Sequence, residues 1–477
     1  MKYLKNLLLT LFIMNILSCN NKNTLEYPIT KKETIKETYF NTEIEDPYRW
    51  LENDTAKEVK LWIQEQNNLT SKYLENISYR EEIRNRLQEL WNYEKTGTPF
   101  KEGEYTYYYK NNGLQNQYVL YRKNAEEKEE IFIDPNKFSE DGTISLSGIY
   151  FSNDGSKLAY SISEGGSDWR KVIVIDTKTK DLLEDTLLNI KFSGISWKGN
   201  EGFYYSSYET TKDATLSTKN EHHKLYYHKL NTNQKDDDIV FGNERNEKFR
   251  YVGGKITKDE RYLIISGSQT TSGNNLFIKD LSKKNPKLIQ ITTDFKSDSY
   301  VIHNIGSLLY ISTNLNANNR KLISVDAKNP SPNNWKDIIK ETKNVLSVSK
   351  GGGYFFARYL IDVNSKILQY DYNGNLIREV ELESKGNVTG FSGKEDDDNL
   401  YYNFTNYITP RSSFKYNVET GLSNKYWSPA IKFNSDSYTS KQMFYTSKDG
   451  TKIPITITHK KGIVLNGKNP TILYGYG

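Results

Sequence analysis

Seven short segments rich in aromatic and aliphatic residues decide how this chain folds. They are EYTYYY at residues 104–109, KLAYSI at 157–162, GFYYSS at 202–207, RYLIIS at 261–266, SLLYIS at 307–312, GYFFAR at 353–358 and NLYYNF at 399–404. Each is short, apolar and bounded by polar turn residues, a pattern typical of buried strands. Their near-constant spacing of about 50 residues is the period of β-propeller blades. We therefore predict a mainly β chain with a seven-bladed β-propeller over residues 96–428.

Each of these segments is followed by a second predicted strand. The second strands are QYVLYR from residue 117, KVIVID from 171, KLYYHK from 224, NLFIKD from 275, KLISVD from 321, KILQYD from 366 and SFKYNV from 413. The turns between them are short and rich in Gly, Asn and Ser, as β-hairpins require. A pair of irregular β-sandwiches is the alternative fold, but it would not keep one period throughout.

The segments before and after the repeats have different patterns. Between residues 46 and 93 apolar residues recur at helical spacing, and Asp54 and Thr55 are candidate N-caps for the first helix. After Trp427 we expect three strands, at residues 442–447, 452–459 and 470–474. This divides the chain into a helical segment at 27–95, the propeller, and a final domain that starts at 429.

The N-terminus has the features of a secretory signal. Lys2 and Lys5 precede an apolar run over residues 7–17, and Cys19 follows a lipobox-like cleavage site. We expect residues 1–18 to be a lipoprotein signal peptide, Cys19 to be acylated, and residues 19–26 to be a tether. The protein would then be exported and membrane-anchored only through lipid, at the periplasm or cell surface. The alternative is a buried N-terminal strand with an incidental cysteine.

Composition excludes several classes of protein. The 477 residues (55.4 kDa) exceed one compact core, and a content of 36% hydrophobic and 13% aromatic residues excludes a mainly disordered chain. The net charge of +5 is spread along the chain, which does not suggest a nucleic-acid groove. One cysteine and five scattered histidines give no zinc-finger spacing, so we expect neither metal nor cofactor.

Several blocks together resemble the prolyl oligopeptidases, serine peptidases with a seven-bladed propeller and an α/β-hydrolase domain. The blocks are DPYRWLE at residues 46–52, GLQNQ at 113–117, GSDW at 166–169, HKLYYH at 223–228, SKDGTKIP at 447–454, HKKG at 459–462 and YGYG at 474–477. The resemblance implies that residues 27–95 pack on the hydrolase domain and that residues 429–477 are its first part. It implies a serine endopeptidase that cleaves short peptides on the carboxyl side of proline.

The resemblance also assigns residues to the site. Tyr476 resembles the tyrosine that stabilises the oxyanion, Phe192 resembles an aromatic that lines the pocket for a residue upstream of proline, and Asp168 and Trp169 resemble a loop near the catalytic domain. Phe192 could instead be a propeller core aromatic. Residues 266–271 (SGSQTT) depart from the family, which has an arginine and a cysteine there, so thiol sensitivity should be missing.

Family members place the catalytic triad after the YGYG block, and no G-x-S-x-G nucleophile motif occurs in residues 1–477. We expect structural roles for the five histidines and no activity from these 477 residues alone. The expected partners are short proline-containing peptides, and the expected state is a monomer. Two alternatives stay open: a non-catalytic, lipid-anchored propeller that binds peptides or a protein partner, and a related oligopeptidase that cleaves after basic residues. The coding sequence beyond residue 477 would separate enzyme from binder.

Overall fold

The computed structural model describes residues 25–184, 186–209, 220–244 and 247–475. The described chain divides into two compact units, one before residue 88 and one from residue 88 onward. Each unit is considered by itself below. Cys19 and Tyr476, for which the sequence predicts roles, lie outside the described residues.

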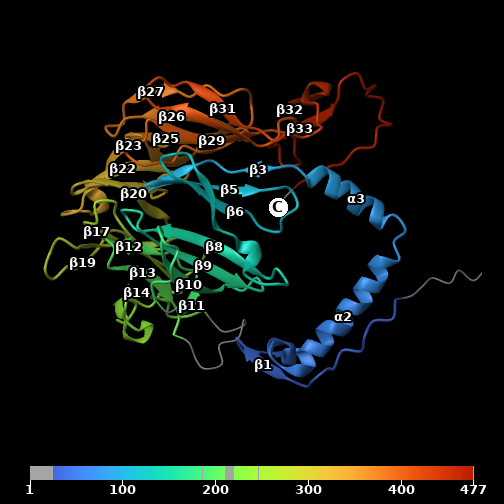
Figure 1. Cartoon of the computed structure of the whole chain (residues 1–477), viewed down its shortest axis with the longest axis horizontal. Helices are drawn as coiled ribbons and strands as arrows, with labels where there is room; N and C mark the ends of the chain where they lie inside the picture. Colours follow the sequence, from blue (N-terminus) through green and yellow to red (C-terminus); the bar gives the residue numbers. More distant parts are fainter. Residues whose placement is uncertain (1–24, 185, 210–219, 245–246, 476–477) are drawn as a thin grey trace, which may run out of the picture. The chain divides into compact units, whose positions relative to one another are not determined.

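The larger unit contains seven antiparallel sheets, each made from consecutive strands (Figure 1). Blade 1 has the strands β3 (Lys95–Thr96), β4 (Phe100–Glu102), β5 (Tyr105–Asn111), β6 (Val119–Lys123) and β7 (Glu129–Ile133). Blade 2 has β8 (Ile144–Phe151), β9 (Lys157–Glu164), β10 (Trp169–Asp176) and β11 (Leu187–Lys191). Blade 3 has β12 (Ser196–Lys198), β13 (Gly202–Ser207), β14 (Lys224–Lys229) and β15 (Asp238–Phe241).

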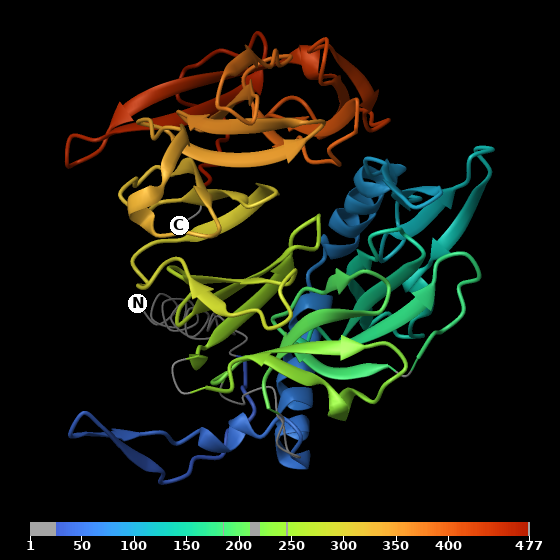
Figure 2. The ribbon, with the colours of Figure 1, turned by 90° about the vertical axis from the view of Figure 1, so that its left-hand side faces the viewer.

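The remaining four blades repeat this plan. Blade 4 has β16 (Tyr251–Ile256), β17 (Tyr262–Ser268), β18 (Asn275–Asp280) and β19 (Leu288–Gln290), and blade 5 has β20 (Ser299–Ile305), β21 (Leu308–Thr313), β22 (Lys321–Asp326) and β23 (Lys336–Ile339). Blade 6 has β24 (Val345–Gly351), β25 (Tyr354–Ile361), β26 (Asn364–Tyr370) and β27 (Leu376–Glu379), and blade 7 has β28 (Asn387–Gly390), β29 (Asn399–Thr405), β30 (Ser412–Asn417) and β31 (Ser423–Trp427). The blades follow one another in chain order, from cyan to orange (Figure 2). The predicted seven-bladed propeller is confirmed.

In blades 2 to 6 both faces are buried, because successive side chains of a strand point alternately to the two neighbouring blades. In β13, Phe203 and Tyr205 pack into an apolar cluster shared with blade 2, whereas Tyr204 packs into the cluster shared with blade 4. Six such clusters fill the six interfaces from blade 1/2 to blade 6/7. Among the described residues no apolar cluster joins blade 7 to blade 1. There the ammonium of Lys394 lies 3.0 Å from the carboxylate of Glu102.

A cavity of about 840 Å³ runs into the centre of the ring. Every blade contributes to its wall, through Phe100, Phe151, Trp197, Ile256, Val301, Lys350 and Tyr401 in blade order. This shared wall shows that the seven sheets surround a common axis, with the first or second strand of each blade innermost.

The smaller unit starts with a hairpin, β1 (Lys36–Tyr39) and β2 (Thr42–Glu45), followed by a 3₁₀ turn (Arg49–Glu52) and α2 (Lys57–Glu75). The next helix, α3 (Arg80–Trp91), runs across the boundary between the units. Arg49 lies 2.7 Å from both Glu37 and Asp46, which ties the hairpin to the turn. The predicted side-chain cap is wrong: Ala56 occupies the N-cap of α2, and no side chain caps the helix there.

After the propeller, β32 (Tyr438–Thr446) and β33 (Lys452–Lys460) form a hairpin. The third strand predicted at residues 470–474 is wrong, because those residues form no ladder and Ile472 is 94% exposed. A strand of this apolar type needs hydrogen-bonding neighbours on its edges, and none of the described strands pairs with it.

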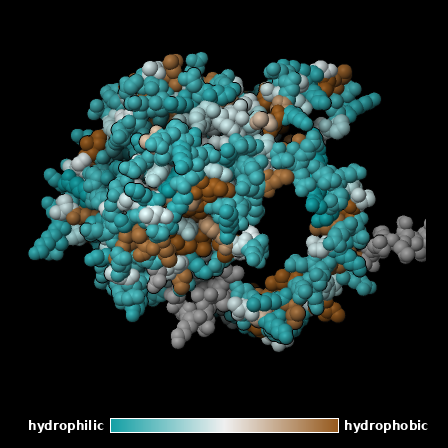
Figure 3. Space-filling view, in the orientation of Figure 1, coloured by the Kyte–Doolittle hydropathy of each residue, from teal (hydrophilic) through white to brown (hydrophobic). Residues whose placement is uncertain are grey.

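Hydrophilic residues cover most of the propeller face that Figure 3 shows, with apolar patches between them. Within the described part of the chain, no helix combines the length and apolar character that a membrane span needs.

Candidate functional site

The candidate site is built on the last residue of β11 and the first residue of β10 in blade 2. The antiparallel register places Lys191 directly opposite Trp169, so the two side chains project from the same face of the sheet. The Lys191 ammonium lies 4.8 Å from the centre of the Trp169 ring and 5.3 Å from that of Phe192. Both distances are within the range of cation–π attraction. Sequence-predicted Trp169 and Phe192 therefore meet around a lysine that the sequence analysis did not single out.

Phe192 leaves the sheet in an unusual conformation. Its φ of 50° is in the left-handed region, which a bulky aromatic residue adopts only when surrounding contacts hold it there. Those contacts are edge-to-face with Tyr208 at 6.4 Å and Tyr251 at 5.6 Å. The ring remains 41% exposed, so Phe192 is not a core aromatic of the propeller. We call Trp169, Lys191, Phe192, Tyr208 and Tyr251 the Phe192 cluster.

A buried histidine, His223, packs against the Phe192 cluster. His223 stacks on Tyr208 with ring centres 4.3 Å apart, and the Tyr208 hydroxyl donates to the carbonyl of Arg250 at 2.7 Å. The backbone N–H of Val252 donates to Nδ1 of His223 at 2.9 Å, so the other ring nitrogen, Nε2, carries the proton. Nε2 then donates to the carbonyl of Lys191 at 3.0 Å.

Burial keeps His223 neutral near pH 7. Burial lowers the pKa of His223 to about 4, although the hydrogen bond to the Lys191 carbonyl opposes the shift. His223 therefore orients the end of β11 instead of exchanging protons near neutral pH.

Asp168 precedes Trp169 and lies near the Lys191 ammonium without forming an ion pair with it among the described contacts. Burial lowers the pKa of Lys191, and the charge of Asp168 partly offsets this. The structure thus brings together three of the sequence-predicted residues, Asp168, Trp169 and Phe192. Tyr476 lies outside the described residues, so its position relative to the cluster is not described.

The departure predicted at residues 266–271 lies beside the cluster. Gln269 accepts a hydrogen bond from the N–H of Arg250 at 3.3 Å and donates to the carbonyl of Lys248 at 3.1 Å. Gln269 therefore holds the backbone on both sides of Phe249, next to Tyr251 of the cluster. The only cysteine of the chain is Cys19, so no thiol lies here.

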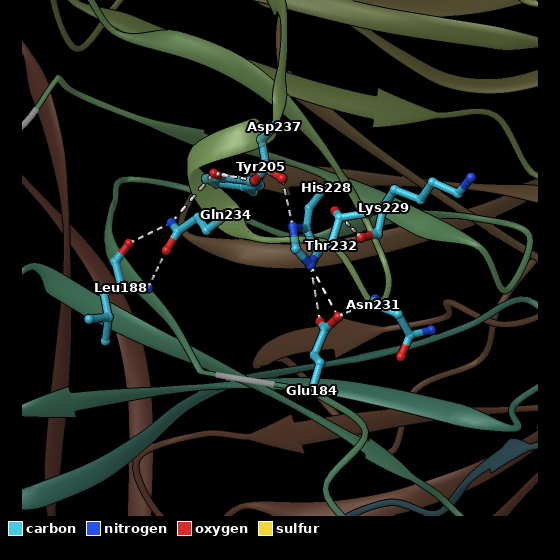
Figure 4. A network of polar contacts seen from close by, with 9 residues as sticks. All are labelled: Glu184, Leu188, Tyr205, His228, Lys229, Asn231, Thr232, Gln234 and Asp237. Carbon is cyan, nitrogen blue, oxygen red and sulfur yellow. Dashed lines mark hydrogen bonds and ion pairs between the residues drawn. The ribbon is translucent and has the colours of Figure 1, made fainter.

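A second polar centre surrounds His228 in blade 3 (Figure 4). Nδ1 of His228 lies 2.7 Å from Asp237 and Nε2 lies 3.2 Å from Glu184, and Tyr205 donates to Asp237 at 2.8 Å. Burial alone would lower the pKa of His228, but the hydrogen bonds to Asp237 and Glu184 outweigh it and raise the pKa to about 9. This histidine is a cation buried between two carboxylates.

Neither buried histidine belongs to a catalytic triad. Within the described residues no serine hydroxyl is hydrogen-bonded to a histidine, and no group of three His, Cys, Asp or Glu side chains could hold a metal ion. What the Phe192 cluster offers is a rigid aromatic surface with a cation at its centre, which suits recognition of a peptide side chain more than bond cleavage.

Comparisons with known proteins assign this chain to a family. Residues 27–429 match the family model described as prolyl oligopeptidase, N-terminal beta-propeller domain. The chain is 49% identical over 479 residues to a prolyl endopeptidase of Elizabethkingia meningoseptica and 48% identical to one of Elizabethkingia miricola, covering 100% of this chain and 68% of each relative. The chain belongs to the prolyl oligopeptidase family.

Solved structures agree with the sequence comparisons. One comes from a structural and mechanistic analysis of two prolyl endopeptidases and gives a TM-score of 0.83 at 28% identity, covering 92% of this chain and 65% of that one. Prolyl oligopeptidase B from Galerina marginata, bound to a 35mer substrate, gives 0.79 at 27% identity, covering 91% and 66%. The chain spans about two thirds of the length of these relatives.

Sequence reasoning missed Lys191, Tyr208 and Tyr251. Lys191 directly precedes Phe192 in the sequence, but its pairing with Trp169 depends on the register between β10 and β11, which only the structure shows. Tyr208 directly follows the aromatic β13, but nothing in its spacing indicated a contact with Phe192, because the connection runs through three-dimensional packing between blades.

Proposed function

We propose that this chain is the propeller-bearing part of a serine endopeptidase that cleaves short peptides after proline. The observation that carries the proposal is the 49% identity to a prolyl endopeptidase along the whole chain. The nucleophilic serine, the histidine base and the aspartate would lie in sequence outside residues 1–477, because these residues contain no G-x-S-x-G motif.

In this proposal Phe192, Trp169 and Asp168 contact the peptide or border its site. Tyr476 would donate its hydroxyl to the oxyanion of the tetrahedral intermediate, a contribution typically worth about 3 kcal/mol to the barrier. The ring of blades would restrict access to short, flexible chains, because a folded protein has a volume far larger than the cavity of about 840 Å³.

The experiment compares two proteins on one peptide pair. The full gene product and residues 27–477 are each given internally quenched peptides that carry Pro or Ala at a single position. We expect the full protein to cut only the Pro peptide, on its carboxyl side, with loss of activity after a serine-directed organophosphorus inhibitor. We expect no cleavage from residues 27–477. Cleavage of the Ala peptide at an equal rate, or insensitivity to the inhibitor, contradicts the proposal.

We also propose that Cys19 is acylated and anchors the protein to a membrane surface, and that the protein is a monomer. The lipobox-like residues before Cys19 support the anchor. Cells fed a clickable palmitate analogue should label the wild-type protein and leave the Cys19→Ala variant unlabelled. Equal labelling of both proteins, or a dimer mass by light scattering, contradicts these assignments.

A further inference from the structure

Two donors in the Phe192 cluster have no acceptor. Lys191 is only 3% exposed, and within the described chain its ammonium has neither a hydrogen bond nor an ion pair. The indole Nε1 of Trp169 is buried and also lacks a hydrogen-bond partner. Buried donors are satisfied in the great majority of native structures, so the unpaired Nε1 of Trp169 beside an ammonium without a partner points to an acceptor that binds there.

Burial lowers the pKa of Lys191, but two features of its surroundings favour the charged form. Its ammonium faces the rings of Trp169 and Phe192, which attract a cation, and Asp168 is near enough to raise the lysine pKa that burial lowers. An ammonium with free donors at the edge of an exposed aromatic ring prefers an anionic oxygen over a neutral one, because charge-assisted hydrogen bonds are the stronger kind.

A second cation, Arg250, lies beside Tyr251 of the cluster. Arg250 is exposed, its guanidinium lies 5.8 Å from the centre of the Tyr251 ring, and the described residues give it no ion-pair partner. Tyr251 in turn contacts Phe192 at 5.6 Å. Arg250 also borders a surface cavity of about 600 Å³, shared with Gln269, Lys248 and one acid, Glu221. This cavity leaves room beside the cluster for a side chain.

We infer that Lys191 and Arg250 form a carboxylate-binding subsite at Phe192, which selects peptides with Glu or Asp shortly before the cleaved proline. The inference rests on the proposed function and deepens it: Phe192 supplies the apolar contact, and the Lys191 ammonium and the Arg250 guanidinium bind the carboxylate. A Glu or Asp side chain should bind this subsite more tightly than a neutral side chain. Its carboxylate oxygens accept charge-assisted hydrogen bonds, which are stronger than those that water or a neutral side chain accepts.

The test uses the full gene product and matched peptides. Each pair differs only by Glu or Gln, placed in turn at each of the three positions before the proline, and kcat/KM is measured for each peptide. We expect the Glu peptide to be preferred about tenfold at one position, the effect of one charge-assisted hydrogen bond. Because exposed charge interactions are screened, the preference should fall as NaCl rises from 0.05 to 0.5 M.

Variants assign the preference to these residues. Lys191→Met keeps the apolar stem, and we expect it to bring the Glu/Gln ratio close to one because the Glu peptide loses much more rate than the Gln peptide. Arg250→Gln, on the surface, should reduce the ratio partly and serves if Lys191→Met does not fold. Lys258→Met removes an exposed lysine from the mouth of the central cavity and should leave the ratio unchanged.

Three outcomes overturn the inference. They are a wild-type ratio near one at all three positions, a ratio that survives both variants, and an equal loss for Glu and Gln peptides, which would show that Lys191 pairs with another part of the protein. If no proline peptide is cleaved, the proposed function fails, and calorimetric binding of the same peptides decides the subsite. Tighter binding of the Glu peptide that is lost in Lys191→Met supports it, and equal binding overturns it.

Discussion

His228 illustrates how one residue joins two blades. Nδ1 of its imidazole contacts Asp237 of the same blade, and Nε2 contacts Glu184 from the β10–β11 connection of blade 2. The three side chains are almost completely buried. Removing one member of a buried ion pair leaves uncompensated charge, which typically costs about 3 kcal/mol or more.

We therefore expect His228→Gln to destabilise the propeller by about 3 kcal/mol at pH 7. The pKa of His228 is raised to about 9 in the folded protein, above the ordinary value of 6.5. The stabilisation is thus complete below about pH 6.5 and disappears as the pH rises through 9. Chemical denaturation of both proteins at pH 6, 7, 8, 9 and 10 measures this as a gap in unfolding free energy that closes at high pH.

His459→Gln is the matched control, since within the described residues the His459 side chain has a single polar contact, between Nδ1 and the carbonyl of its neighbour Lys460. It should show no such gap at any pH. A His228→Gln gap that is constant from pH 6 to pH 10 would mean that the histidine acts by packing alone.

Phe192 yields a second prediction at this scale. Phe192→Ala removes an exposed ring that we place against the peptide, so KM for proline peptides should rise about tenfold while the melting temperature changes little. Phe433→Ala is a control of similar exposure, 40% against 41%, whose ring contacts Tyr438 after the propeller. Steady-state kinetics that show the same KM for both variants would remove Phe192 from the site.

Sequence could predict part of this residue-level picture. Phe192, Trp169 and Asp168 came from resemblance, and the structure places them together. Glu184 could not be found as a partner of His228, because 44 residues separate them and their contact exists only once two blades pack.

At the scale of elements, tight turns fit one blade against the next. Gly155, in the β8–β9 turn, has a φ of 74°, and a Cβ there would lie 2.3 Å from the backbone nitrogen of Gly103 in blade 1. Backbone cannot move aside as a flexible side chain can. Gly155→Ala should therefore lower the unfolding free energy by about 3 kcal/mol, from overpacking plus the left-handed conformation, measured by denaturant titration.

Gly165→Ala separates the two causes. Gly165 has a φ of 58°, but a Cβ there would meet nothing within 4 Å, so it should lose only about 1 kcal/mol from the backbone conformation. Equal losses at the two glycines would show that the contact with Gly103 contributes nothing.

The elements also mark where sequence patterns stop being sufficient. The paired strands of each blade were predictable, because apolar period and turn chemistry are local. The N-cap was misplaced, since Asp54 and Thr55 precede the helix start at Lys57 by too much to cap it and Ala56 intervenes. The apolar run at 470–474 looked like a buried strand, but a strand depends on partners, and the described residues provide none.

For the whole molecule, a single period predicted the architecture. A blade of four strands has two apolar faces, so only a ring of blades covers them all, and six of the seven interfaces are filled by apolar clusters. The remaining interface, between blades 7 and 1, carries the Lys394–Glu102 ion pair instead. Repeat spacing could not predict this difference, because it depends on which side chains end the first and last repeats.

The central claim is that the surface carrying Phe192 receives the peptide upstream of a cleaved proline. The most direct measurement is photocrosslinking of a proline peptide with benzoylphenylalanine at the residues before the proline, with the attachment site read by mass spectrometry on the full gene product. We expect attachment to Trp169, Phe192, Tyr208 or Tyr251, and competition by an unlabelled proline peptide. Attachment confined to other surfaces, such as the mouth of the central cavity at Lys258, would contradict the account.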